Sequence, residues 1–63
     1  METTYYNPKS GKVNYKAIEK AVGHKLDYEE REYAIYYYES GNTGLPDFDS
    51  EAMSDFCLML HGG

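Results

Sequence analysis

The clearest alternation of apolar and polar positions lies near the end of the sequence. Four apolar residues follow one another at i, i+3, i+4, i+7 and would share one face of a helix: Met53, Phe56, Cys57 and Leu60. Asp49 and Ser50 precede them as candidate N-caps, and Gly62 follows as a helix stop. The pattern predicts a helix over residues 49–61.

A second amphipathic pattern lies over residues 14–22. Asn14 is a good N-cap, and Gly23 suits the left-handed residue that ends a helix. The apolar face consists of Ala17, Ile18, Ala21 and Val22, and the opposite side carries Lys12, Lys16 and Lys20. The sequence predicts a short helix with a solvated lysine stripe.

The central segment, residues 27–40, carries conflicting signals. Asp27 and Glu30 have the spacing of a capping box, and Gly41 supplies a stop. Residues 33–38 read Tyr-Ala-Ile-Tyr-Tyr-Tyr, which is rich in strand formers, and Arg31 interrupts the helical apolar face. We favour a helix because of its caps. The alternative is a strand over residues 33–39, which would make the fold α+β.

Residues 1–12 have no helical period. Asn7-Pro8-Lys9-Ser10-Gly11 has turn chemistry, so this segment is either an extended arm or a short hairpin. We favour the arm, because an isolated two-stranded hairpin is barely stable. The expected fold is therefore a mainly α, single small domain over residues 1–63, with about three short helices after an N-terminal arm or hairpin.

The length of the chain limits its stability. A chain of 63 residues buries only about 60% of its unfolded surface, so its core is marginal. Its one cysteine cannot form an internal disulfide, and we expect a partner or self-association, such as a homodimer, to add stability. The lone thiol and the lack of a signal peptide favour the cytoplasm, and no apolar run is long enough for a membrane span.

The net charge of −5 is unevenly distributed. Residues 1–26 carry five lysines against two glutamates, whereas residues 27–63 carry nine carboxylates against Arg31. An acidic face of this kind suits a partner protein with a basic surface, and it argues against direct binding to nucleic acid. A solvated surface that keeps the chain soluble explains the same charges.

The residues that often carry catalysis have structural explanations here. His24 and His61 each stand next to a glycine at an expected helix end, where an imidazole can cap the helix. Cys57 lies on an apolar face near acidic residues, which is a poor setting for a reactive thiolate. We find no metal-ligand spacing and no phosphate-binding loop, and so expect no enzyme activity, metal or cofactor.

Tyrosine is concentrated in the central segment, which holds five of the eight tyrosines. Tyr36, Tyr37 and Tyr38 are consecutive, so no regular element can bury all three on one face. Tyrosine offers a large contact area with little side-chain entropy to lose. These residues either wrap a thin core or form part of a partner surface, and we favour the partner surface.

Glu32-Tyr33-Ala34-Ile35, followed by Tyr38-Glu39, resembles the Glu-Tyr-Ala-Ile-x-x-Tyr-Glu segment of ArdA-type antirestriction proteins. Members of that family are DNA mimics from mobile elements, and their carboxylates stand in for phosphates on restriction enzymes. The resemblance covers about eight residues of a much longer family, which uses the segment as a strand. It implies an inhibitor of a DNA-handling enzyme.

These observations predict a small acidic inhibitor, phage- or mobile-element-encoded, that blocks a nucleic-acid-binding enzyme in the manner of antirestriction or anti-CRISPR proteins. It would act in the cytoplasm, which for a phage protein is that of the host cell. The expected contact residues are Glu29, Glu30, Glu32, Tyr33, Tyr36, Tyr37, Glu39, Asp47, Asp49, Glu51 and Asp55. The alternative is a non-catalytic helical scaffold or regulatory subunit that binds through the apolar stripe of residues 53–60. A third hypothesis is a nucleic-acid-binding module that uses the lysine stripe.

Overall fold

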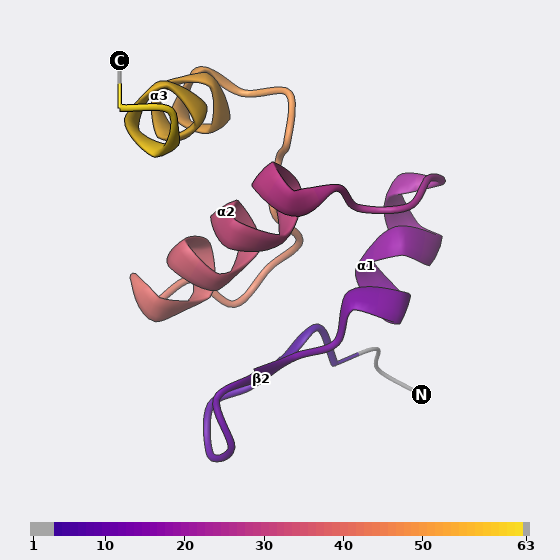
Figure 1. Ribbon diagram of the computed structural model, residues 1–63. Helices are drawn as coiled ribbons and strands as arrows, with labels where there is room; N and C mark the ends of the chain where they lie inside the picture. Colours follow the sequence, from indigo (N-terminus) through magenta and orange to yellow (C-terminus); the bar gives the residue numbers. More distant parts are fainter. Residues whose placement is uncertain (1–3, 63) are drawn as a thin grey trace.

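A computed structural model describes residues 4–62 and confirms a mainly α domain with a short hairpin before the helices. Figure 1 shows the elements, which in chain order are β1 (Tyr6–Asn7), β2 (Lys12–Val13), α1 (Tyr15–Val22), α2 (Tyr28–Glu39) and α3 (Glu51–Leu60). Each helix agrees with its predicted range to within two residues at either end.

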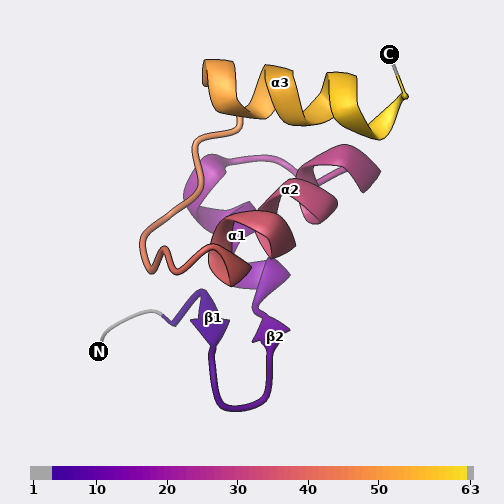
Figure 2. The same cartoon turned by 90° about the vertical axis from the view of Figure 1, so that its left-hand side faces the viewer.

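Helix α2 is the central element of the fold. Figures 1 and 2 show α3 on one side of α2, and α1 with the β1–β2 hairpin on the other. The core is divided in the same way. One cluster lies between α2, α1 and the hairpin and contains Ile18, Leu26, Ala34 and Tyr38; the other lies between α2 and α3 and contains Tyr33, Met53 and Phe56. Tyr37 and Phe48 pack against both clusters and join them.

The predicted caps account for the ends of the helices. The Asn14 side chain accepts a hydrogen bond from the Ala17 amide, and Gly23 ends α1 with a φ of 86°. Asp27 and Glu30 form a complete capping box at the start of α2. Ser50, and not Asp49, is the N-cap of α3, and its hydroxyl accepts from the Met53 amide. These bonds satisfy backbone donors that a helix leaves free at its N-terminus.

The strand alternative for residues 33–39 is wrong, because the whole segment lies within α2. Side chains of the segment are divided between two buried faces of the helix. Tyr33 lies in the cluster against α3, and Ala34 and Tyr38 lie in the cluster against α1. Strand-forming residue types therefore occur here because a central helix needs bulky side chains on two faces, and tertiary packing overrides intrinsic propensity.

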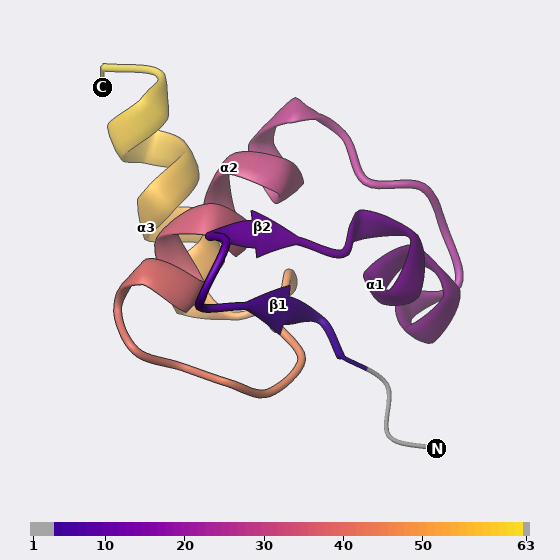
Figure 3. The same ribbon diagram turned by 90° about the horizontal axis from the view of Figure 1, so that it is seen from below.

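The preference for an extended arm is also wrong. Tyr6 pairs with Val13 and Asn7 with Lys12 in an antiparallel hairpin, which Figure 3 shows from below. The hairpin is short, but it does not stand alone. The Tyr6 ring stacks on Tyr38 of α2, with centroids 4.9 Å apart and planes 3° from parallel. The Asn14 amide also donates to the Tyr5 carbonyl at 2.7 Å. Packing against a helix supplies the stability that an isolated hairpin lacks.

Candidate partner-binding surface

The fold separates the two signs of charge that the sequence separates. The five lysines lie on the hairpin, on α1 and in the connection to α2, and all five are exposed. The carboxylates of residues 27–62 lie on α2 and its N-cap, on the loop after it and on α3, with Arg31 as the one lysine or arginine in that range. The α2–α3 half therefore carries a net negative charge.

Two carboxylates are held in place at the start of α2. Asp27 Oδ1 accepts from the Glu30 amide at 2.8 Å, and Glu30 Oε1 accepts from the Asp27 amide at 3.1 Å. The preceding connection is fixed by Glu19, whose Oε2 accepts from the Leu26 amide at 3.0 Å. These bonds restrict the rotamers of Asp27 and Glu30, so a partner would meet carboxylates that have little side-chain entropy left to lose.

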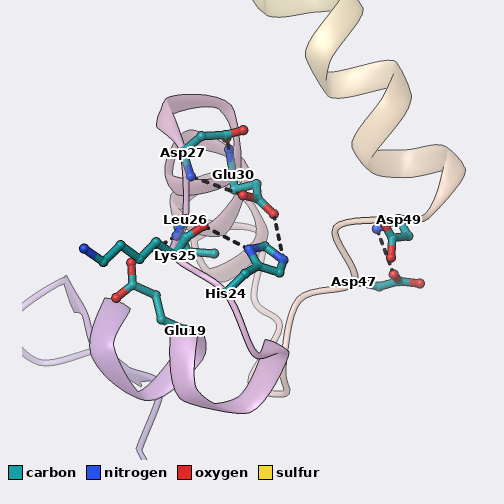
Figure 4. A network of polar contacts seen from close by, with 8 residues as sticks. All are labelled: Glu19, His24, Lys25, Leu26, Asp27, Glu30, Asp47 and Asp49. Carbon is teal, nitrogen blue, oxygen red and sulfur yellow. Dashed lines mark hydrogen bonds and ion pairs between the residues drawn. The ribbon is translucent and has the colours of Figure 1, made fainter.

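Both histidines contact glutamates at the start of α2. His24 Nε2 lies 3.6 Å from Glu30 Oε2, and its Nδ1 lies 2.9 Å from the Lys25 carbonyl oxygen, as Figure 4 shows. His61, beyond the end of α3, lies 3.0 Å from Glu29 Oε1 through Nε2. The pKa of His24 is raised, first by the hydrogen bond to the Lys25 carbonyl and then by nearby carboxylates that include Glu30.

The loop before α3 brings two further carboxylates toward this region. Asp47 and Asp49 line a hollow of about 420 Å³ whose wall includes His24, and Asp49 is close enough to help raise the His24 pKa. Asp47 Oδ1 accepts from the Asp49 amide at 3.0 Å, so this turn is also ordered. We name Asp27, Glu30, Asp47 and Asp49 the acidic surface; Figure 4 shows all four around His24.

The acidic surface has an apolar floor. A second hollow, of about 510 Å³, lies between the start of α2 and α3, and Phe48 lines both hollows. The remaining apolar lining of the second hollow is Met53, Cys57 and Leu58, and Asp27 and Glu30 lie at its acidic wall. Such a concave surface suits a basic side chain with a long aliphatic stem.

Glu29 and Cys57 are linked across the α2–α3 interface. Hydrogen bonding from the Cys57 thiol, and then from His61, lowers the pKa of Glu29. The same contact raises the pKa of Cys57 to about 11, and burial and the neighbouring carboxylates Asp27 and Glu30 add to the shift. A thiol with so high a pKa is a poor nucleophile at neutral pH.

The other predicted carboxylates lie apart from the acidic surface. Glu32 is half-buried beside Tyr15 and Arg31, and Glu39 is exposed at the last residue of α2. Glu51 and Asp55 are exposed on α3, four residues apart and therefore on one face of that helix. The structure thus divides the predicted carboxylates over several faces.

The three predicted contact tyrosines have different surroundings. Tyr33 is 4% exposed and packs against Phe56, so it offers a partner almost no surface and leaves the set of candidate contacts. Tyr37 is half-buried between the two core clusters. Tyr36 is 52% exposed and is the one of the three with substantial free area. Sequence reasoning missed Tyr28, which is 70% exposed, because its place at the first turn of α2 gave no separate signal.

The apolar stripe of α3 is largely engaged inside the chain. Met53 and Phe56 are buried against Tyr33, and Cys57 is partly buried beside them. Sequence reasoning missed the apolar residues of the outer side, Leu58 and Met59, which are 65% and 63% exposed. The five consecutive apolar residues Phe56–Leu60 at the end of α3 cannot all face α2, and that run was the available signal.

Residues 4–62 contain no group of three or more His, Cys, Asp or Glu side chains that could hold a metal ion. No helix in that range has both the length and the apolar character that crossing a bilayer requires. Comparison of the chain with protein-family models, with curated proteins and with solved structures finds no match. Functional inference therefore rests on the geometry of the chain itself.

Proposed function

We propose that this protein is a small acidic inhibitor that binds a basic surface of a nucleic-acid-binding enzyme and keeps nucleic acid away from it. The carboxylates take the place of phosphates, as in proteins of the antirestriction or anti-CRISPR type. The protein acts without catalysis, in the cytoplasm of the cell that holds the enzyme. For a phage or mobile-element protein, that cell is the host.

One observation carries this proposal: the charge of residues 27–62 is nine carboxylates against one arginine, and it is displayed by ordered elements. A surface of one sign steers a partner of the opposite sign and accelerates association. The capping bonds of Asp27 and Glu30, and the turn that holds Asp47, restrict these side chains before binding. A disordered acidic tail, by contrast, would lose conformational entropy on binding.

The experiment that tests the proposal is affinity capture from a bacterial lysate with elution by a salt gradient. Carboxylates without a hydrogen bond or ion pair among residues 4–62 are suitable for substitution, because their removal leaves the caps intact. The acidic variant is Glu32→Gln with Glu39→Gln and Asp49→Asn. The matched control removes three charges of the other sign: Lys12→Gln with Lys16→Gln and Lys20→Gln.

We expect the captured partner to be a nucleic-acid-binding enzyme that elutes at moderate salt and that duplex DNA displaces. The acidic variant should release it at lower salt, and the lysine control should hold it at least as well as the unchanged chain. A partner that resists both high salt and DNA, and binds all three proteins equally, would refute the proposal. It would favour the helical scaffold, for which exposed Leu58 and Met59 supply the contact area.

A further inference from the structure

A third hollow lies on the flank of α3 opposite the acidic surface. It has a volume of about 260 Å³ and shares no residue with the two hollows described above. We name it the tyrosine groove; its lining is Tyr36, Ala52, Asp55, Phe56 and Met59. Tyr36 comes from α2 and the other four residues from α3.

The Tyr36 ring is supported on one side and available on the other. Its centroid lies 5.3 Å from that of Phe56 and 6.4 Å from that of Tyr33, both of which are buried. Half of the Tyr36 side chain nevertheless remains exposed, so nothing in the described chain covers its outer part. The ring therefore presents an aromatic surface that two buried rings support from below.

The remaining lining supplies a negative charge and a flexible apolar wall. Asp55 is exposed and accepts no hydrogen bond or ion pair from residues 4–62. Met59 lies one turn after Asp55 and is 63% exposed, with an unbranched thioether that adapts to its neighbour. Helix α3 contains no lysine or arginine, and Glu51 lies one turn before Asp55. The groove therefore complements a cation that also carries apolar surface.

The chain itself contains an internal example of such a contact. The Arg31 guanidinium carbon lies 5.9 Å from the centre of the Tyr15 ring, and Glu32 is close enough to influence the same tyrosine. Burial and then Glu32 raise the pKa of Tyr15, and Arg31 opposes that shift. An arginine over a tyrosine ring, beside a carboxylate, thus already occurs between α1 and α2.

We propose that the tyrosine groove binds an arginine side chain of the partner protein. The guanidinium stacks on Tyr36 and pairs with Asp55, while its aliphatic stem lies against Met59 and Ala52. Arginine fits better than lysine because its planar, weakly hydrated head both stacks on aromatic rings and forms directed bonds to carboxylates. This inference rests on the proposed function, since it names one contact that the basic partner makes.

A second copy of the chain is a poor occupant of the groove. The chain has one arginine, and Arg31 already lies over Tyr15, so another copy offers mainly lysines. The oligomeric state provides the corresponding check. If the Met59 methyl resonance shifted with protein concentration alone, a second copy would occupy the groove and the inference would be overturned.

The test is a titration of the full chain, labelled with ¹³C at the methionine methyls, in low salt. The probe is an acetylated and amidated peptide with three arginines separated by glycines. Matched peptides carry lysine or the neutral isostere citrulline in place of arginine. We expect the arginine peptide to shift the exposed Met59 methyl and to leave the buried Met53 methyl nearly unchanged. The lysine peptide should bind several-fold more weakly, and the citrulline peptide should show no saturation.

Substitutions locate the contact. Tyr36→Leu and Asp55→Asn should each weaken the arginine peptide by about two- to fivefold, as expected for an exposed cation–π contact or ion pair. Tyr36→Phe keeps the ring and should keep the affinity. Asp49→Asn removes the same charge from the acidic surface and serves as the matched control.

Equal binding of the lysine peptide, or equal effects of Asp49→Asn and Asp55→Asn, would overturn the inference about the groove. Either result is compatible with a salt-sensitive, DNA-displaceable partner, so the proposed function would survive it. Conversely, a partner insensitive to salt and DNA would refute the proposed function even if the arginine peptide bound at Tyr36.

Discussion

Tyr38 is the residue whose replacement tests the central packing of the fold. It is 2% exposed, its ring stacks on Tyr6, and its hydroxyl donates to the Gly44 carbonyl at 2.9 Å. One side chain therefore joins the hairpin, α2 and the loop that leads to α3. Tyr38→Phe keeps the ring and removes only the hydroxyl contact.

The expected loss follows from that contact. Removing a hydrogen bond of this kind costs about 1 kcal/mol, and no further penalty is expected because exposed Gly44 can turn its carbonyl to water. At 0.05–0.15 kcal/mol per residue, the whole chain has a free energy of unfolding of roughly 3–9 kcal/mol. Tyr38→Phe should thus lower the melting temperature by about 4–8 °C. Tyr38→Ala, which should cost about 3–5 kcal/mol, should remove a large share of that free energy and lower the melting temperature several times further than Tyr38→Phe.

Urea and thermal unfolding, followed by far-ultraviolet circular dichroism, measure both effects. The matched control is Tyr36→Phe, because the Tyr36 hydroxyl has no hydrogen-bond partner in residues 4–62 and should change stability by less than about 0.5 kcal/mol. If Tyr38→Phe and Tyr36→Phe melted together, the Tyr38–Gly44 bond would contribute nothing. If Tyr38→Ala melted together with Tyr38→Phe, the hairpin and α2 would not depend on the ring of this side chain.

Three further predictions concern the start of α2 and its neighbours. Asp27→Ala removes half of the capping box and should lower the free energy of unfolding by about 1 kcal/mol. Asp27→Asn is the control, because asparagine is a good N-cap, and it should lower the free energy of unfolding by less. With a pKa of about 11, Cys57 should react with iodoacetamide at pH 8 about tenfold more slowly than free cysteine. Glu29→Gln should accelerate this reaction. A rate equal to that of the free amino acid would contradict the thiol–carboxylate contact. The ¹H resonances of His24 should titrate above pH 6.5, so its small contribution to stability is complete below that pH and fades as the pH rises through the folded-state pKa. Glu30→Gln should reduce that upward shift, and a His24 pKa at or below 6.5 would rule out the contacts.

Local signals in the sequence were sufficient to locate the helices. Asn14 with Gly23, and Asp27 with Glu30, make in the structure the bonds that their spacing predicts, because caps depend on residues a few positions apart. The hairpin was less predictable. Its stability depends on Tyr6 meeting Tyr38, thirty-two residues later, and no local pattern carries that information.

Helix α2 explains why periodicity gave an ambiguous answer for the central segment. A helix buried on one face shows one apolar stripe, but α2 packs against α3 through Tyr33 and against α1 through Ala34 and Tyr38. Two buried faces leave a narrow exposed strip, so polar and apolar residues do not alternate with a single helical period. The same two-sided packing decides which tyrosines remain exposed to solvent. The sequence alone therefore could not show that Tyr33 is buried and Tyr36 is exposed.

The candidate site was predictable in its charge and not in its geometry. Acidic residues after position 26 indicated a basic partner, but the sequence could not show that His24 contacts Glu30 and also lines one hollow with Asp47 and Asp49. That arrangement depends on the course of residues 40–50, which returns past α2 before α3 begins. The tyrosine groove likewise combines two helices and has no single sequence signal.

The carboxylates at the start of α2 serve folding and candidate binding together, and this limits what a charge variant proves. Neutralising Asp27 or Glu30 removes a cap as well as a negative charge, so weaker binding by such a variant would have two causes. Glu32, Glu39 and Asp49 have no such bond within residues 4–62, and their loss changes the surface potential while leaving the helix caps intact. The partner-binding proposal is therefore decided by these residues. If their removal leaves binding unchanged, the carboxylates outside the caps do not hold the partner, and the proposal of an acidic inhibitor fails.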